Sequence, residues 1–149
     1  MTDRTTHTFK VSLQGEPSIY REIEIASTTS LYRLAAAIVA AFGFDLDHAF
    51  GFYTKLTGRD VLGSEPRYEL FHDMGEDTDS LSVRKTMVDQ AFAEPGEKML
   101  FLFDYGDDWR FVVELLRISP AKKGTRYPRL VSHRGAAPQQ YPDPDRTVH

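Results

Sequence analysis

The stretch KMLFLFDYGDDWRFVVELLRI constrains the fold of this chain more than any other part of it. Two apolar runs of high β propensity flank a short polar segment with an Asp-Gly type turn signal, a pattern that predicts a β-hairpin. Side chains alternate across a strand, so Phe101 and Phe103 would share one face. Leu100 and Leu102, on the other face, are apolar as well. The sequence therefore predicts a central hairpin that is buried on much of both faces.

A second hairpin is predicted at the start of the chain, in HTFKVSLQGEPSIYREIEIAS. Apolar residues alternate from Phe9 to Leu13 and again from Ile19 to Ile25, with Arg21 at one of the alternating positions. The segment between them carries the Gly and Pro of a turn.

A helix is predicted from about residue 31 to residue 42. Apolar residues recur there at helical spacing, at positions 31, 34, 38 and 42. Thr29 or Ser30 can cap the first turn, and Gly43 can supply a left-handed end. A second helix is predicted from roughly Val83 to Phe92, before Pro95 and Gly96.

The middle of the chain contains two strand candidates, HAFGFYTK and RYELFHD, joined by a turn-rich connection. An acidic loop follows the second of them. Its four carboxylates suggest calcium, but the order of an EF-hand loop is absent. They are Asp73, Glu76, Asp77 and Asp79.

Residues 1–149 are expected to form a single α+β domain with a core of about residues 7–119. We expect a mixed β-sheet with an opening ββα unit, which is β-grasp-like in topology, and two helices packed on the sheet. Residues 120–149 are rich in proline and poor in periodic apolar residues. This C-terminal segment is expected to wrap the surface or to trail away, with disorder at its end.

The absence of cysteine removes several functions. A disulfide framework, a thiolate nucleophile and a cysteine zinc site are all excluded. The chain also lacks an apolar leader and any run of about 18 apolar residues, so we expect a cytoplasmic protein with no membrane partner.

The basic residues are unevenly distributed along this acidic chain of net charge −4. Of the 18 Lys and Arg residues, six lie between positions 117 and 134, whereas all 22 Asp and Glu lie outside that segment. Such a segment is either a solvated loop or a surface that attracts an anionic partner, including nucleic acid. The six are Arg117, Lys122, Lys123, Arg126, Arg129 and Arg134.

The turn of the central hairpin supplies the candidate polar site. Its members are His48, Asp104, Tyr105, Asp107, Asp108 and Trp109. In a structural interpretation, Asp107 and Asp108 accept N–H bonds of the turn, and Gly106 takes a positive φ. Trp109 then pairs across the strands with Tyr105 or Phe103. In a functional interpretation, His48 converges with Asp104 and Asp107 to bind a divalent metal or to transfer protons.

Three stretches of the chain together resemble a known family. They are LAAAIVAAFGFDLDHAFGF, FLFDYGDDWRFVVELLRI and YPRLVSHRGAAPQQYPD, and the family is the plasmid pRiA4b open-reading-frame-three-like family. Residues that fit its motifs are Gly43, His48, Phe52, Asp104, Tyr105, Gly106, Asp107, Trp109, Gly135, Ala137 and Pro138.

The chain also departs from the family motifs. Phe44 stands where Trp is usual, and Phe103 replaces a leading Tyr. Phe111 stands at a His position, and Gln139 with Gln140 replaces a Pro-Glu pair. These departures remove a histidine and a carboxylate from any polar site.

What the resemblance implies is an association with plasmids or mobile elements, without an assigned activity. We expect a non-enzymatic binding or accessory domain that needs no cofactor and has a protein partner. One alternative is a metal-assisted enzyme that uses His48 and the aspartate turn, with His48, Asp104 and Asp107 as the metal ligands. Another is a weak nucleic-acid-binding protein that uses the basic segment.

Overall fold

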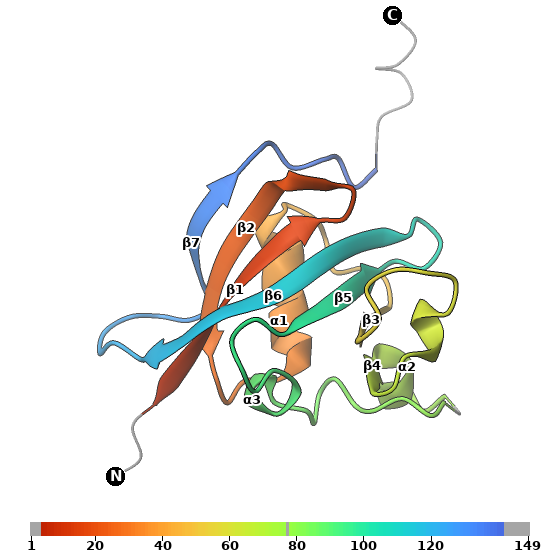
Figure 1. Cartoon of the computed structure of the whole chain (residues 1–149), viewed down its shortest axis with the longest axis horizontal. Helices are drawn as coiled ribbons and strands as arrows, with labels where there is room; N and C mark the ends of the chain where they lie inside the picture. Colours follow the sequence, from red (N-terminus) through yellow and green to blue (C-terminus); the bar gives the residue numbers. More distant parts are fainter. Residues whose placement is uncertain (1–3, 77, 142–149) are drawn as a thin grey trace, which may run out of the picture.

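The computed structural model describes residues 4–76 and 78–141, which form one seven-stranded sheet with a few short helices (Figure 1). The strands are β1 (Thr5–Leu13), β2 (Glu16–Ala26), β3 (Phe50–Tyr53), β4 (Arg67–Glu69), β5 (Lys98–Phe103), β6 (Trp109–Pro120) and β7 (Arg129–Arg134). The helices are α1 (Leu31–Ala41), α2 (Leu70–Asp73), α3 (Val88–Ala91) and the 3₁₀ turn η1 (Val61–Gly63).

The sheet has the strand order β4-β3-β5-β6-β1-β2-β7. Every pair of neighbouring strands is antiparallel, so the prediction of a mixed sheet was wrong. The reason is that α1 carries the chain from β2 to β3, which are not neighbours, and the opening ββα unit therefore creates no parallel pair. The likeness to a β-grasp fold is limited to the order of these first elements.

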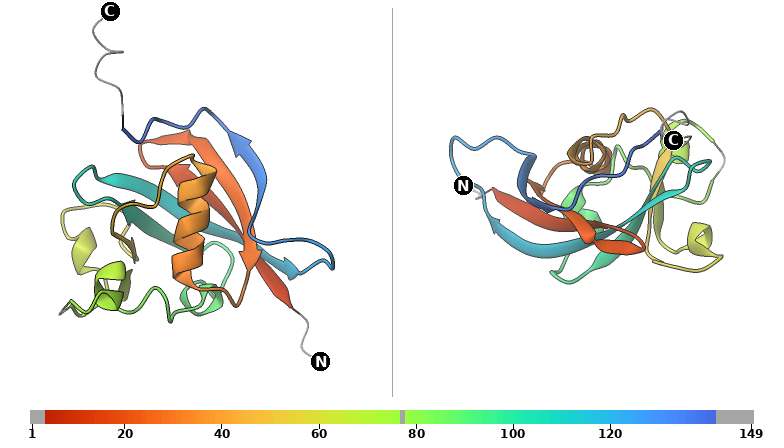
Figure 2. Two further views of the ribbon diagram at one scale, coloured as in Figure 1. Left: turned by 180° about the vertical axis from the view of Figure 1, so that it is seen from behind. Right: turned by 90° about the horizontal axis from the view of Figure 1, so that it is seen from above.

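Helix α1 lies across one face of the sheet (Figure 2). It begins where the sequence predicts, because the Ser30 side chain accepts a hydrogen bond from the Arg33 N–H. It ends before Gly43, which has a φ of 72°. The buried side chains of Leu31, Leu34 and Ile38 attach the helix to the sheet.

The predicted burial of the central hairpin on both faces is confirmed. Phe101 and Phe103 belong to the main core beneath α1. On the opposite face, Leu100 and Leu102 form a smaller core with Tyr53 of β3 and with Val61, which lies in the segment between β3 and β4.

The second predicted helix is much shorter than expected. Only Val88–Ala91 is helical, because the carbonyls of the preceding segment have partners in α1. The N–H of Tyr32 donates to the Val83 oxygen, and the N–H of Leu31 donates to the Thr86 oxygen. The stretch RYELFHD is likewise a strand for three residues and then continues as α2.

The C-terminal segment contributes an unexpected strand. Strand β7 pairs with β2 through residues 129–134, outside the core expected from the sequence. The final residues, for which we expected disorder, lie outside the described part of the chain. No helix within that part has the length and apolar character needed to cross a membrane.

Candidate functional site

The turn between β5 and β6 is built on two strained aspartates. Asp104 has a φ of 63° and Asp108 a φ of 58°, whereas Gly106 is not among the glycines with positive φ. The expected role of Gly106 was therefore wrong. Asp104 instead stabilises the turn, because its Oδ1 accepts the Asp107 N–H at 3.2 Å and its carbonyl accepts the Asp108 N–H at 2.6 Å. Aspartate tolerates the left-handed region better than most residues when it makes such local bonds.

The structure brings His48 and Asp104 together at this end of the sheet. The His48 Nε2 lies 3.4 Å from Asp104 Oδ2 and 3.8 Å from Asp47 Oδ1. Asp104 is buried, with 6% of its surface exposed, whereas 44% of the His48 side chain is exposed. One carboxylate of the turn and one imidazole thus form a half-open polar pair.

The C-terminal segment contacts this pair, which the sequence did not indicate. The Tyr141 hydroxyl donates to Asp47 Oδ2 at 2.9 Å and lies 2.8 Å from His48 Nε2. Because that hydroxyl has one proton, its oxygen accepts from the imidazole. Partial burial and the hydrogen bond to Asp47 raise the pKa of Tyr141 to about 12, so the phenol stays protonated at neutral pH.

Gln140 joins the same contact. Its amide oxygen accepts the Asp45 N–H at 2.8 Å, and its Nε2 donates to the Asp45 carbonyl and to Asp47 Oδ1 at 3.1 Å. Asp45, Asp47, Gln140 and Tyr141 are therefore site residues that sequence reasoning missed. The one signal in the sequence was the Gln pair at positions where the family pattern has Pro-Glu.

The remaining residues of the predicted site point elsewhere. Asp108 is exposed and accepts a hydrogen bond from the Arg110 Nε at 2.8 Å. Trp109 lies opposite Phe103, as one of the predicted pairings had it, and its ring is 4.9 Å from that of Phe44. The Nε1 of Trp109 is buried and has no hydrogen-bond partner among the described residues.

Tyr105 faces the opposite side of the sheet, in a buried polar cluster that the sequence did not predict. The Tyr53 hydroxyl donates to Glu69 Oε2 at 2.5 Å and accepts from the Tyr105 hydroxyl at 2.7 Å. Burial raises the pKa of both phenols above their ordinary value. Thr78 donates to the other oxygen of Glu69 at 3.1 Å, so this buried carboxylate has partners on both oxygens.

A metal site finds little support in this geometry. Within residues 4–76 and 78–141 there is no group of three His, Asp or Glu side chains arranged to hold an ion. His48 and Asp104 meet, but no contact joins the Asp107 carboxylate to them among these residues. In the acidic loop, Asp73 accepts the Val83 and Arg84 N–H groups, and Asp77 lies outside the described residues.

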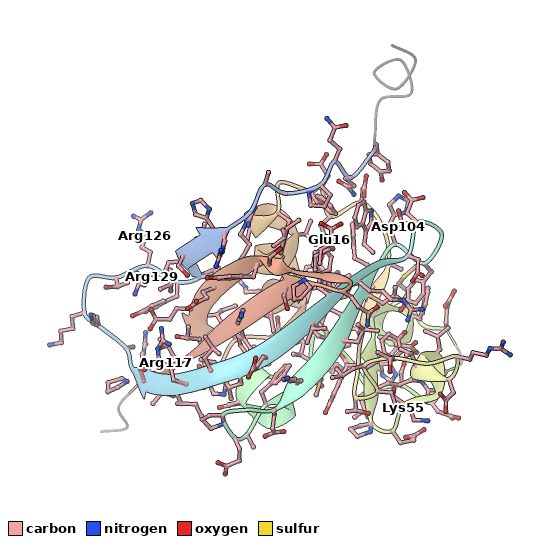
Figure 3. All side chains as sticks on the ribbon, turned by 45° about the horizontal axis from the view of Figure 1, so that its top comes forward. Glu16, Lys55, Asp104, Arg117, Arg126 and Arg129 are labelled. Carbon is pink, nitrogen blue, oxygen red and sulfur yellow. The ribbon has the colours of Figure 1, made fainter. Side chains whose placement is uncertain are left out.

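The predicted basic residues mostly gather at one end of the molecule. Arg117, Arg126 and Arg129 lie together there, away from Asp104 and Lys55 (Figure 3). We call this region, with Lys122 and Lys123 of the same loop, the basic end. Arg134 stands apart, because five strand residues place it roughly 17 Å from Arg129 along β7.

One carboxylate lies within the basic end. Glu24 accepts from the Arg129 Nε at 2.8 Å and from the Thr6 hydroxyl at 2.6 Å. Burial disfavours its ionised form, but these two bonds and the charges of Arg129 and Lys122 outweigh burial and hold the pKa of Glu24 below its ordinary value. Arg117, Lys122, Lys123 and Arg126 form no ion pair with any described residue.

We predict that Asp108→Gly stabilises the protein by about 0.5–1 kcal/mol, because glycine adopts a positive φ without the penalty of a Cβ. The lost ion pair with Arg110 is exposed and contributes little. Urea unfolding followed by Trp109 fluorescence would measure the change. Asp104→Gly is the matched control, and it should not stabilise, since it removes the buried carboxylate that holds the turn. If Asp108→Gly lowered the free energy of unfolding, the positive φ of Asp108 would not be a source of strain.

Comparison with known proteins places the chain in a family. Residues 5–141 match the model of the plasmid pRiA4b ORF-3-like protein family. The uncharacterized protein y4hQ of Sinorhizobium fredii is 29% identical over 133 residues, which cover 88% of this chain and 63% of that protein's length. The crystal structure of MM3350, a protein of unknown function from Methanosarcina mazei Go1, has the same fold. Its TM-score is 0.75 at 23% identity, over 93% of this chain and 75% of that one. The chain therefore belongs to the plasmid pRiA4b ORF-3-like protein family.

Proposed function

We propose that this chain is a non-enzymatic binding domain that holds an anionic partner at the basic end. The observation that carries this proposal is the unbalanced charge of that region. Four cations have no ion-pair partner among the described residues, and the nearby carboxylate of Glu24 is already bonded to Thr6 and Arg129. A cluster of cations on an acidic protein directs an anion to one place on its surface.

The His48 pair supports an enzyme less well. A metal-assisted reaction needs a ligand set that keeps a position open for substrate. Here one histidine meets one buried carboxylate, and the Tyr141 hydroxyl lies against the same Nε2 of the imidazole that faces Asp104. A binding domain could also have an accessory role in a plasmid or mobile element. That association is supported by the family alone.

The test uses two polyanions, a poly-glutamate peptide and a DNA duplex, each immobilised for biolayer interferometry. We expect at least one of them to bind the full chain and to lose about tenfold in affinity when NaCl rises from roughly 50 to 300 mM. Neutralising the loop by Lys122→Gln, Lys123→Gln and Arg126→Gln should abolish this binding.

Arg59 provides the control, because it is exposed in another loop and Arg59→Gln leaves the basic end intact. Equal binding by the loop variant, or no binding of either polyanion at low salt, would overturn the proposal.

A further inference from the structure

Strand β7 is an open edge of the sheet. The sheet ends at β4 on one side and at β7 on the other. The outer side of β4 is occupied, because Leu81 donates to the Arg67 carbonyl at 2.9 Å and its own carbonyl accepts from the Glu69 N–H at 3.0 Å. No described segment pairs with the outer side of β7. An open edge carries backbone donors and acceptors that another strand can use.

An apolar groove of about 340 Å³ runs between this edge and α1. Its wall on the helix consists of small side chains, which leave room above the sheet. Its wall on the strand includes Leu130, which is 47% exposed. The groove is lined by Ile23, Ala37, Ala40, Ala41, Pro128 and Leu130, with Arg129 beside them.

We propose that an extended acidic peptide binds here, as an added strand beside β7 with one apolar side chain in the groove. This inference rests on the proposed function and names the partner. The edge supplies backbone hydrogen bonds, and the groove accepts alternate side chains, which is how peptides add to sheets. Arg126 and Arg134 lie in the loop before the strand and at its far end, where they would attract the acidic residues of the peptide.

The same cations disfavour other occupants. A second copy of this chain would bring its own β7 arginines against them, so like charges oppose edge-to-edge pairing. Single-stranded nucleic acid needs aromatic platforms for its bases. Tyr127, the aromatic residue of this loop, has its hydroxyl engaged by the Lys122 N–H at 3.1 Å. The groove itself is apolar and suits an aliphatic side chain.

The experiment uses an acidic peptide of about ten residues, long enough for one strand, with a central leucine among glutamates. Two matched peptides are N-methylated at alternate amides, so that each has lost one set of backbone donors without a change of charge. We expect the parent peptide to bind the full chain and one N-methylated peptide to lose about tenfold or more in affinity. Hydrogen exchange should show new protection of β7 amides.

Variants of the chain test the contribution of the groove and the contribution of the arginines one at a time. Ala40→Phe fills the groove and should weaken the parent peptide about tenfold. Ala36→Phe is the control on the same helix, because Ala36 lines a different hollow beside Tyr32 and Arg33. Arg126→Glu should weaken the peptide, whereas Arg59→Glu should not.

The outcomes distinguish this inference from the proposed function. If DNA binds in a salt-dependent manner and the peptide does not bind, the proposal of an anionic partner is supported and the proposal of an acidic peptide is wrong. If both N-methylated peptides bind as well as the parent, or if Ala40→Phe has no effect, strand addition is wrong. If neither polyanion nor peptide binds at low salt, the proposed function itself fails.

Discussion

Gly51→Ala is expected to lower the free energy of unfolding by about 2–3 kcal/mol, as overpacking of a buried site does. A Cβ at this position would lie 2.8 Å from both Cε2 and the hydroxyl of Tyr53, and 2.9 Å from the Tyr105 hydroxyl. Neither ring can move aside cheaply. Tyr53 is fully buried, and its hydroxyl holds Glu69 while it accepts from Tyr105.

Any shift of Tyr53 away from the new methyl group would therefore leave the buried Glu69 carboxylate without one of its donors. Urea unfolding, followed by the fluorescence of the single Trp109, would measure the loss. Gly63→Ala is the control, because nothing lies within 4 Å of a Cβ at Gly63 and its φ is not positive. We expect Gly63→Ala to raise the free energy of unfolding slightly, by less than about 1 kcal/mol. If the two substitutions changed the free energy of unfolding equally, Tyr53 and Tyr105 would be able to move aside at little cost.

The elements that the sequence predicted correctly are those with local signals. The alternation in β1 and β2, the apolar runs of β5 and β6 and the cap of α1 each depend on residues a few positions apart. The Ser30 cap and the left-handed Gly43 were both readable, because the Ser30 side chain bonds to a backbone N–H three residues away and Gly43 acts through its own backbone conformation.

The elements that were predicted wrongly depend on distant partners. Residues 83–87 have the apolar spacing of a helix, but the oxygens of Val83 and Thr86 bond to the first turn of α1. Strand β7 has no alternation to reveal it, and it forms because β2 offers an edge. Such pairings override local propensity.

The candidate site was predictable only in part, because some of its contacts join residues that are far apart along the chain. His48 and Asp104 lie next to β3 and β5, which pair although they are far apart along the chain. Phe50 lies opposite Phe103, and the meeting of His48 with Asp104 follows from the register of these two strands. Tyr141 is 93 residues away from His48 along the chain, and nothing local connects them. Tyr105 does not join the other members of the predicted polar site, because its side chain points toward Tyr53.

The aromatic departures from the family motif prove to be core positions. Phe111, at a place where the family pattern has His, is 1% exposed and packs on Phe42, with ring centroids 4.8 Å apart. Phe44, where Trp is usual, packs edge to face against Trp109. These two substitutions therefore exchange buried ring for ring, and neither removes a side chain from the half-open pair of His48 and Asp104.

Arg21→Met is expected to cost about 2–4 kcal/mol, because it removes a buried cation that satisfies several carbonyls at once. Arg21 stands at an alternating apolar position of β2 and is 6% exposed. Its Nε donates to the Ala41 oxygen at the end of α1, at 3.1 Å. Its Nη1 lies 2.9–3.1 Å from the oxygens of Tyr20, Arg134 and Gly135. One side chain thus joins α1, β2 and the end of β7.

Methionine keeps an apolar side chain at this position, but it lacks the guanidinium, whose Cζ lies 4.8 Å from the centroid of the Phe42 ring. It supplies no donor, so the carbonyls of Ala41, Arg134 and Gly135 lose their partner. Urea unfolding should show the global loss, and hydrogen exchange should show the largest local loss of protection in β7. Arg33→Met is the control, since Arg33 is exposed on α1 and should change stability by about 0.5 kcal/mol or less. If Arg21→Met left both readouts unchanged, water would be replacing the guanidinium at these carbonyls, and the attachment of β7 would rest on its pairing with β2 alone.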